Sequence, residues 1–279
     1  MALVLGALAM GISPIFVRLA DVGPFASAFW RVMLALPLLY GWMRFEERQN
    51  APLQKFSKPA LLAGLAFAGD LFFWHLAIVT TNVANATFFA TTAPIWVVVF
   101  GWLLLSERPS RSIIIGIGLC LAGGGLLLAQ SLQLSARSAI GDGFGMATGV
   151  FFGLYFLCIQ AARRSASAAR VTFEAGVITS ALLFLVAIVS EPHFWPHSSS
   201  GIAALLAMAW VSHVGGQGLL SVALGRLPAD FSSLIIFVEA IAAAGFAYLI
   251  LGEPVSIFQG FGGVAILAGI FVARPKSTA

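Results

Sequence analysis

Long apolar runs, interrupted at short intervals by charges, prolines and glycines, occupy almost the whole chain. They predict ten segments, at roughly 2–20, 24–44, 58–78, 81–105, 111–130, 139–161, 169–190, 201–224, 228–251 and 254–273. Each is close to the roughly 20 apolar residues that a helix needs to cross the hydrocarbon of a bilayer. Because a lipid-exposed segment must satisfy its own backbone hydrogen bonds, all ten are expected to be helices. The pattern predicts an all-α polytopic membrane protein.

Composition supports this prediction. The chain has 279 residues, of which 60% are hydrophobic and 9% charged, and its mean hydropathy is +0.98. A soluble domain carries about 25% charged residues. Ten spans leave no room for a separate soluble domain. Cys120 and Cys158 lie within apolar runs and are typical of packing residues, so we expect no disulfide, no metal and no cofactor.

The basic residues predict the orientation. With the N-terminus in the cytoplasm, the cytoplasmic loops and tail receive Arg44, Arg48, Lys55, Lys58, Arg108, Arg111, Arg163, Arg164, Arg170, Arg226, Arg274 and Lys276. The opposite side receives only Arg137, and Arg18 and Arg31 lie within or at the ends of spans. Cytoplasmic loops carry such an excess of Lys and Arg, so both termini are expected inside. The same bias explains the net charge of +4 without a nucleic-acid partner.

An offset of 146 residues aligns the chain with itself without gaps. It pairs Glu107 with Glu253, Gly116 with Gly262, and 121–123 with 267–269. Five spans per half is an odd number, so the second half enters the membrane from the opposite face. We predict two inverted five-helix repeats, 1–137 and 138–279. Inverted repeats are typical of carriers that open a midplane site alternately to each side, although some channels and membrane enzymes also contain repeats.

The segments FGWLLLSERP and FAYLILGEPV, which end spans four and nine before Gly-rich helices, carry a family resemblance. In them and in its 5+5 plan the chain resembles the EamA-type transporters of the drug/metabolite transporter superfamily. It is most similar to bacterial exporters of aromatic and other neutral amino acids, through general similarity rather than a diagnostic residue. The Trp-Gly pair usual in the first span of that family is Met10-Gly11 here. The resemblance implies transport across an inner membrane.

Ionisable residues inside spans are costly and are expected to face the bundle interior or a wet cavity. Arg31 and Asp70 fall at similar depths, roughly 10–12 Å below the outer surface. They are candidates for an ion pair, which would either take part in the function of the protein or only hold two helices together. His213 and Glu239 fall near the midplane. They would form either a proton-responsive pair or a neutral Glu239 hydrogen-bonded to another neighbour.

An amino-acid zwitterion needs donors for its carboxylate, acceptors for its ammonium and an apolar wall for its side chain. The segments 70–75 and 210–218 combine these groups and lie on spans three and eight, which are equivalent in the repeat. The predicted cavity-lining residues are Asp70, Trp74, His75, Tyr155, Trp210, His213, Gln217 and Glu239. For each single aromatic residue, lipid contact or packing is the competing interpretation.

Three prolines inside spans, Pro14, Pro37 and Pro94, are candidate hinges because each removes a helix hydrogen bond. Small residues at Gly116, Cys120 and Gly124 are expected to pack helices closely, either between the halves or between subunits. We expect a monomer to be sufficient.

Motifs of enzymes and pumps are missing from the sequence. It has neither a phosphate-binding glycine loop with its Lys, nor HExxH, nor GxSxG. It also lacks the repeated filter or charged ring expected of a channel. The prediction is a secondary carrier or facilitator that exports amino acids by alternating access. The alternative is the export of another small metabolite or an amphipathic drug-like compound by the same fold.

Overall fold

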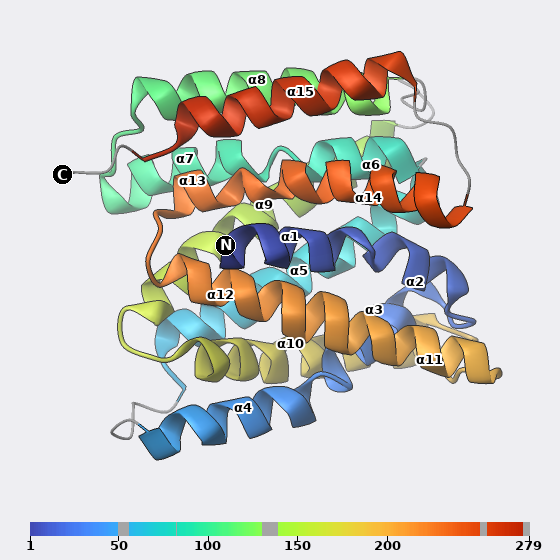
Figure 1. The fold of residues 1–279 in the computed structure, drawn as a ribbon. Helices are drawn as coiled ribbons and strands as arrows, with labels where there is room; N and C mark the ends of the chain where they lie inside the picture. The colour runs from blue at the N-terminus through green and yellow to red at the C-terminus, as the bar shows by residue number, and fades with distance from the viewer. Residues whose placement is uncertain (50–55, 82, 130–138, 252–255, 276–279) are drawn as a thin grey trace.

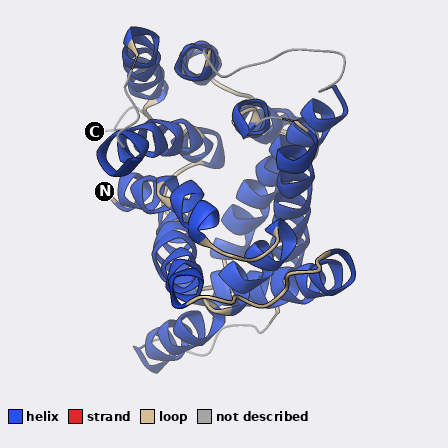
Figure 2. Ribbon diagram, turned by 90° about the vertical axis from the view of Figure 1, so that its right-hand side faces the viewer, coloured by secondary structure: helices blue, strands red, loops and turns tan. Residues whose placement is uncertain are grey.

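A computed structural model describes residues 1–49, 56–81, 83–129, 139–251 and 256–275, and helix is their only regular secondary structure (Figures 1 and 2). The elements are α1 (Ala2–Gly11), α2 (Ser13–Leu19), α3 (Pro24–Met33), α4 (Leu36–Gln49), α5 (Lys58–Thr80), α6 (Val83–Ala90), α7 (Ala93–Leu105), α8 (Arg111–Leu128), α9 (Ala139–Arg163), α10 (Ala168–Ser190), α11 (Ser199–Ala207), the π-helix η1 (Met208–Gln217), α12 (Gly218–Leu224), α13 (Ala229–Ser233), α14 (Ile235–Leu251) and α15 (Ile257–Ala273). The all-α polytopic prediction is confirmed.

Eight helical segments of the described chain are long and apolar enough to cross a membrane. Two shorter apolar segments, Ala2–Val17 and Ile257–Ala273, lie where the first and tenth spans are predicted. The count of ten therefore remains a prediction. Side chains on the outside of the bundle are largely apolar, as at Trp102 and Phe261, which are exposed and suit contact with lipid.

Several predicted spans are two helices rather than one. The first is broken at Ile12, the second at Leu34–Ala35 and the fourth at Thr91–Thr92. In each case a predicted hinge proline, Pro14, Pro37 or Pro94, is the second residue of the helix after the break. Proline lacks the backbone N–H, which is tolerated in the first turn of a helix, whereas further along it would leave the carbonyl four residues earlier without its hydrogen-bond donor. The breaks thus lie where the prolines place them, while hinge motion stays a prediction.

The pair α8 and α15 forms one edge of the bundle (Figure 1). Their backbones approach so closely that a Cβ on Gly116 would lie 2.7 Å from the Gly269 carbonyl oxygen. A Cβ on Gly262 would lie 2.5 Å from the Gly123 carbonyl oxygen, and these two contacts exchange under the 146-residue offset. At the crossing, the Cys120 thiol lies 3.5 Å from the carbonyl oxygen of Ile266, its own equivalent. Small residues therefore join the two halves of the chain here.

On the far side of the bundle, α10 packs against α3, α4 and α5. Each end of this contact is held by a carboxylate at a helix N-terminus, which is the end that favours negative charge. Where α10 ends, Glu191 accepts a 2.6 Å hydrogen bond from the Phe25 N–H at the start of α3. Where α4 ends, Glu46 accepts one of 3.3 Å from the Ala169 N–H at the start of α10. The two segments therefore cap each other.

The basic residues gather at one end of the bundle, which we call the basic end. It contains the end of α4, the start of α8 at Arg111, the end of α9 at Arg163 and the C-terminal end of α15, all at the left of Figure 1. Both chain termini lie toward this end. The opposite end contains Asp21 and the segment 191–198. The Ser198 hydroxyl and the backbone N–H groups of 197 and 198 hydrogen-bond the Asp21 carboxylate and lower its pKa.

Candidate substrate site

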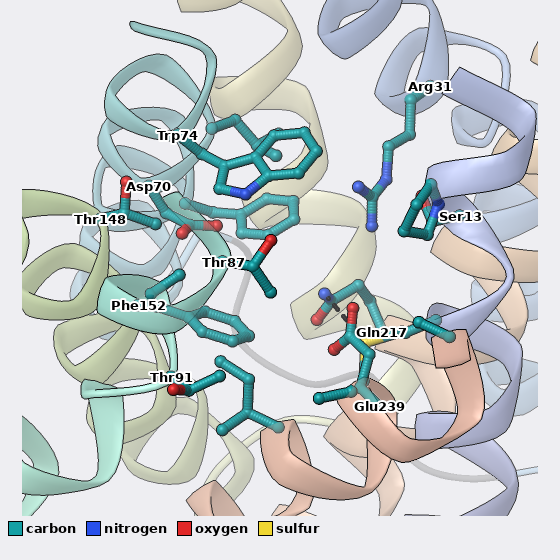
Figure 3. Close-up of a pocket in the computed structure, with 18 residues that line it drawn as sticks. Ser13, Arg31, Asp70, Trp74, Thr87, Thr91, Thr148, Phe152, Gln217 and Glu239 are labelled. Carbon is teal, nitrogen blue, oxygen red and sulfur yellow. Dashed lines mark hydrogen bonds between the residues drawn. The ribbon is translucent and has the colours of Figure 1, made fainter. Parts of the chain in front are cut away.

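A cavity of about 120 Å³ lies inside the bundle, which is room for about four water molecules at their liquid density. Its wall comes from both halves of the chain, as Figure 3 shows. The lining residues are Met10, Ser13, Pro14, Arg31, Phe67, Asp70, Leu71, Trp74, Thr87, Ala90, Thr91, Thr148, Phe152, Gln217, Ile236, Glu239, Ala240 and Ala243. Charged, hydroxyl and aromatic groups thus line one cavity.

The charged groups lie on different walls. Arg31 of α3 points into the cavity from one side, Asp70 of α5 lies across from it and Glu239 of α14 lies below (Figure 3). The Arg31 Nε is buried, and its N–H donates no hydrogen bond to any described part of the protein. Buried polar groups are nearly always hydrogen-bonded in native proteins, so this donor is available to a ligand or a water.

The predicted Arg31–Asp70 ion pair is not formed in this structure, among the ion pairs that its described residues make. The two groups face each other across the cavity, and Glu239 lies on the same side of the cavity as Arg31 (Figure 3). A space between opposite charges suits a zwitterion that contacts both of them. The geometry therefore places Arg31 and Asp70 as two separate lining groups of the cavity rather than as a contact between two helices.

The aromatic wall has a supporting layer. Phe67, which lines the cavity, stacks on Tyr155 with ring centroids 4.7 Å apart, and Phe152 stacks on the same tyrosine at 5.9 Å. The Tyr155 hydroxyl donates a 3.1 Å hydrogen bond to the Gln217 Oε1. Tyr155 is thus buried behind the wall, where it holds a lining residue rather than lining the cavity itself.

Two other predicted residues on the second half also lie away from the cavity. Trp210 is 48% exposed on the outside of the bundle, where its indole N–H donates to the Leu34 carbonyl at the break between α3 and α4. His213 is buried against Phe67, its equivalent under the 146-residue offset, with ring centroids 5.6 Å apart. It makes no pair with Glu239 among the interactions of the described residues. The segment around both residues is π-helical, which turns side chains to directions that an α-helical pattern does not predict.

On α5, His75 is likewise turned from the cavity. Its Nδ1–H donates a 2.6 Å hydrogen bond to the Leu71 carbonyl, and its ring lies 5.9 Å from that of Phe25. By contrast Asp70, Trp74, Gln217 and Glu239 of the predicted set line the cavity, as do Arg31 and Pro14.

Hydroxyl groups and two aromatic rings were missed by the sequence analysis: Ser13, Phe67, Thr87, Thr91, Thr148 and Phe152. Ser and Thr are common in membrane helices, where their hydroxyl groups can hydrogen-bond to the backbone of their own helix, so their presence in a span does not by itself indicate a cavity. Thr91 and Thr148 do this with the carbonyls of Phe88 and Phe144. The position of Ser13 and Thr91 beside the proline breaks is the one signal that points to them.

Fold and cavity together define a polytopic membrane protein with a chamber inside its helix bundle that is largely apolar and carries a few charged and hydroxyl groups. The model of the EamA-like transporter family matches residues 1–129 and 139–274, and the chain belongs to this family. The chain is 23% identical over 272 residues to an uncharacterized transporter of Archaeoglobus fulgidus, which covers 94% of this chain and 92% of the relative. It is 26% identical over 291 residues to an uncharacterized transporter of Helicobacter pylori strain 26695, over 98% of this chain and 93% of the relative.

A crystal structure described only as that of a protein has the same fold, with a TM-score of 0.84 at 18% identity over 96% of this chain and 94% of that one. Membership of a transporter family and relatives named as transporters indicate transport rather than catalysis. The protein is therefore a multi-pass membrane transporter that handles a small molecule within the bilayer.

Proposed function

We propose that this protein is a secondary carrier or facilitator that exports amino acids, aromatic and other neutral ones, by alternating access. The cavity carries this proposal, because one wall offers a buried guanidinium and the others offer carboxyl groups and aromatic rings. A substrate carboxylate pairs with Arg31, its ammonium with Asp70, and its side chain packs on Trp74, Phe67 and Phe152.

The two-repeat plan belongs to the same proposal. The family model matches two successive segments, and the α8–α15 contacts exchange under the 146-residue offset. Two inverted halves, 1–137 and 138–279, supply the two conformations that alternating access requires. We place the carrier in a bacterial inner membrane as a monomer, with the basic end in the cytoplasm.

The test is the uptake of labelled Phe, Trp, Thr and Met into proteoliposomes that contain the purified protein, with protein-free liposomes as the control. Saturable uptake that unlabelled amino acids inhibit is expected. Absence of uptake from folded protein would contradict the proposal. Saturable uptake of an amphipathic cation that amino acids do not inhibit would favour the alternative, export of a metabolite or drug-like compound.

A further inference from the structure

Three ionisable side chains among the described residues line the cavity: Arg31, Asp70 and Glu239. With all three ionised they sum to one negative charge. An uncompensated charge inside a membrane-spanning helix bundle is unfavourable, because the surroundings stabilise it less than bulk water does. A cavity without substrate therefore favours one proton on the two carboxyl groups, which balances the single guanidinium.

The surroundings of Glu239 bring few other charges. Of the elements packed against α14, α1 and α15 have no ionisable side chain within their helical ranges. The remaining ionisable residues of these elements are Arg111 and Cys120 on α8, Asp230 on α13, and Arg18 on α2, whose side chain is outside the described set. Arg111 is the first residue of α8, Cys120 packs on Ile266, and Asp230 lines a separate small pocket. Tyr155 and His213 lie behind Phe67.

The two carboxyl groups differ in their relation to the guanidinium. Arg31 and Glu239 lie on the same side of the cavity, whereas Asp70 lies on the opposite wall beside Trp74 and Thr148 (Figure 3). In the absence of substrate the proton is therefore better placed on Asp70. A bound zwitterion changes this, since its carboxylate takes Arg31 and its ammonium takes Asp70. The proton then resides on Glu239, which has lost its cation.

Resting on the proposed amino-acid transport, we propose that Asp70 and Glu239 share one proton that stays with the protein when a neutral amino acid crosses. A zwitterion has no net charge, so its entry leaves the charge of the cavity unchanged and no proton is moved with it. A substrate with one additional positive charge replaces that proton, which leaves on the side from which the substrate entered. Neutral amino acids are thus carried down their own gradient, and cationic ones exchange for a proton.

The test measures substrate and proton movement together. Proteoliposomes loaded with a pH-sensitive dye receive labelled phenylalanine, arginine or 4-guanidinophenylalanine, the last of which matches phenylalanine in shape and adds a cation. Phenylalanine uptake is expected to be unchanged by an imposed pH gradient and to shift no protons. The two cationic substrates are expected to exchange for one proton each. In the Glu239→Gln protein the number of protons exchanged per cationic substrate is expected to fall from one to zero. In the Glu107→Gln protein it is expected to remain one, because Glu107 is exposed at the basic end.

Each other result is decisive. Proton flux with phenylalanine, or phenylalanine accumulation driven by the pH gradient, overturns the inference and leaves amino-acid transport standing. Entry of the cationic substrates without proton flux, or their failure to enter through protein that carries phenylalanine, also overturns it. Absence of phenylalanine uptake contradicts the proposed function and the inference together. Circular dichroism and size-exclusion profiles of the Glu239→Gln protein establish that it is folded.

Discussion

Arg31 is the residue on which the proposed recognition of an amino acid depends most directly. It points into the cavity, its buried Nε donates no hydrogen bond to the described protein, and it faces two carboxyl groups across open space. A guanidinium that only locked helices together would contact one of these groups. Its placement suits a ligand that supplies the missing carboxylate.

Replacement of Arg31 by glutamine is expected to reduce saturable phenylalanine uptake at least tenfold. A hydrogen bond to a charged group contributes about 1.5–3 kcal/mol, which corresponds to roughly ten- to hundredfold in affinity. The matched control is Arg164→Gln, because the Arg164 side chain is 70% exposed and lies outside the cavity. Equal uptake by both variants would show that Arg31 does not bind substrate.

Trp74 is expected to select for aromatic side chains. Trp74→Ala should raise KM for Trp and Phe by about two- to tenfold and change KM for Thr less, since an aromatic pair contributes about 0.5–1.5 kcal/mol beyond area burial. Trp102→Ala is the control, because Trp102 is 58% exposed on the outside of α7. The measurement is KM for Phe, Trp, Thr and Met in proteoliposomes. An equal rise in KM for all four would argue against contact between Trp74 and the substrate side chain.

For single residues, the sequence predicts which polar groups lie in the cavity better than it predicts where each side chain points. Asp70, Gln217 and Glu239 are found in the cavity because a polar group in a span has few other favourable places. His213 and Trp210 are not, although they lie in the same π-helix as Gln217, because the His213 ring packs on Phe67 and the Trp210 indole donates to the Leu34 carbonyl on the outside of the bundle. Hydrophobic periodicity contains no signal for these tertiary contacts.

At the scale of elements, the helices follow from hydropathy and their breaks from proline. The sequence does not show that the span of α13 and α14 is also broken, at Leu234, because no proline lies there. Its equivalent in the first half is broken at Thr91–Thr92 beside Pro94. The second break is thus a tertiary effect, whereas the close pairing of α8 with α15 was predictable from the spacing of small residues.

Gly116 and Gly118 of α8 provide a matched pair for testing that contact. A Cβ on Gly116 would lie 2.6 Å from the Ala273 Cβ, whereas a Cβ on Gly118 meets nothing within 4 Å. Gly116→Val should destabilise the protein by about 1–3 kcal/mol through overpacking, and Gly118→Val should change stability little. Thermal unfolding in detergent measures both variants. Equal shifts in Tm would mean that the α8–α15 contact does not limit stability.

At the scale of the whole molecule, α10 is joined to α3 at one end of the bundle and to α4 at the other. At the basic end Glu46 caps α10 and Glu47 forms an ion pair with Arg170. At the opposite end Glu191 caps α3. A carrier that alternates must release these ends in turn, so each set of contacts favours closure on its own side.

Removal of one cap should therefore open the cavity toward one side only. Glu191→Ala is expected to favour opening at the end opposite the basic end, and Glu46→Ala opening at the basic end. Each lost hydrogen bond to a carboxylate is worth about 1.5–3 kcal/mol, enough to change the ratio of the two conformations about tenfold or more. The shift arises because each cap stabilises only the conformation in which its own end is closed.

The readout is a cysteine at Ser13, which lines the cavity, in a background of Cys120→Ala and Cys158→Ala. A membrane-impermeant maleimide added to one side of oriented vesicles should label Glu191→Ala faster from the end opposite the basic end, and Glu46→Ala faster from the basic end. Glu107→Ala removes an exposed carboxylate at the basic end and should leave both rates unchanged. If both cap variants changed labelling from the same side, the contacts would stabilise the fold without controlling access, because only opposed effects distinguish two gates from one generally loosened bundle.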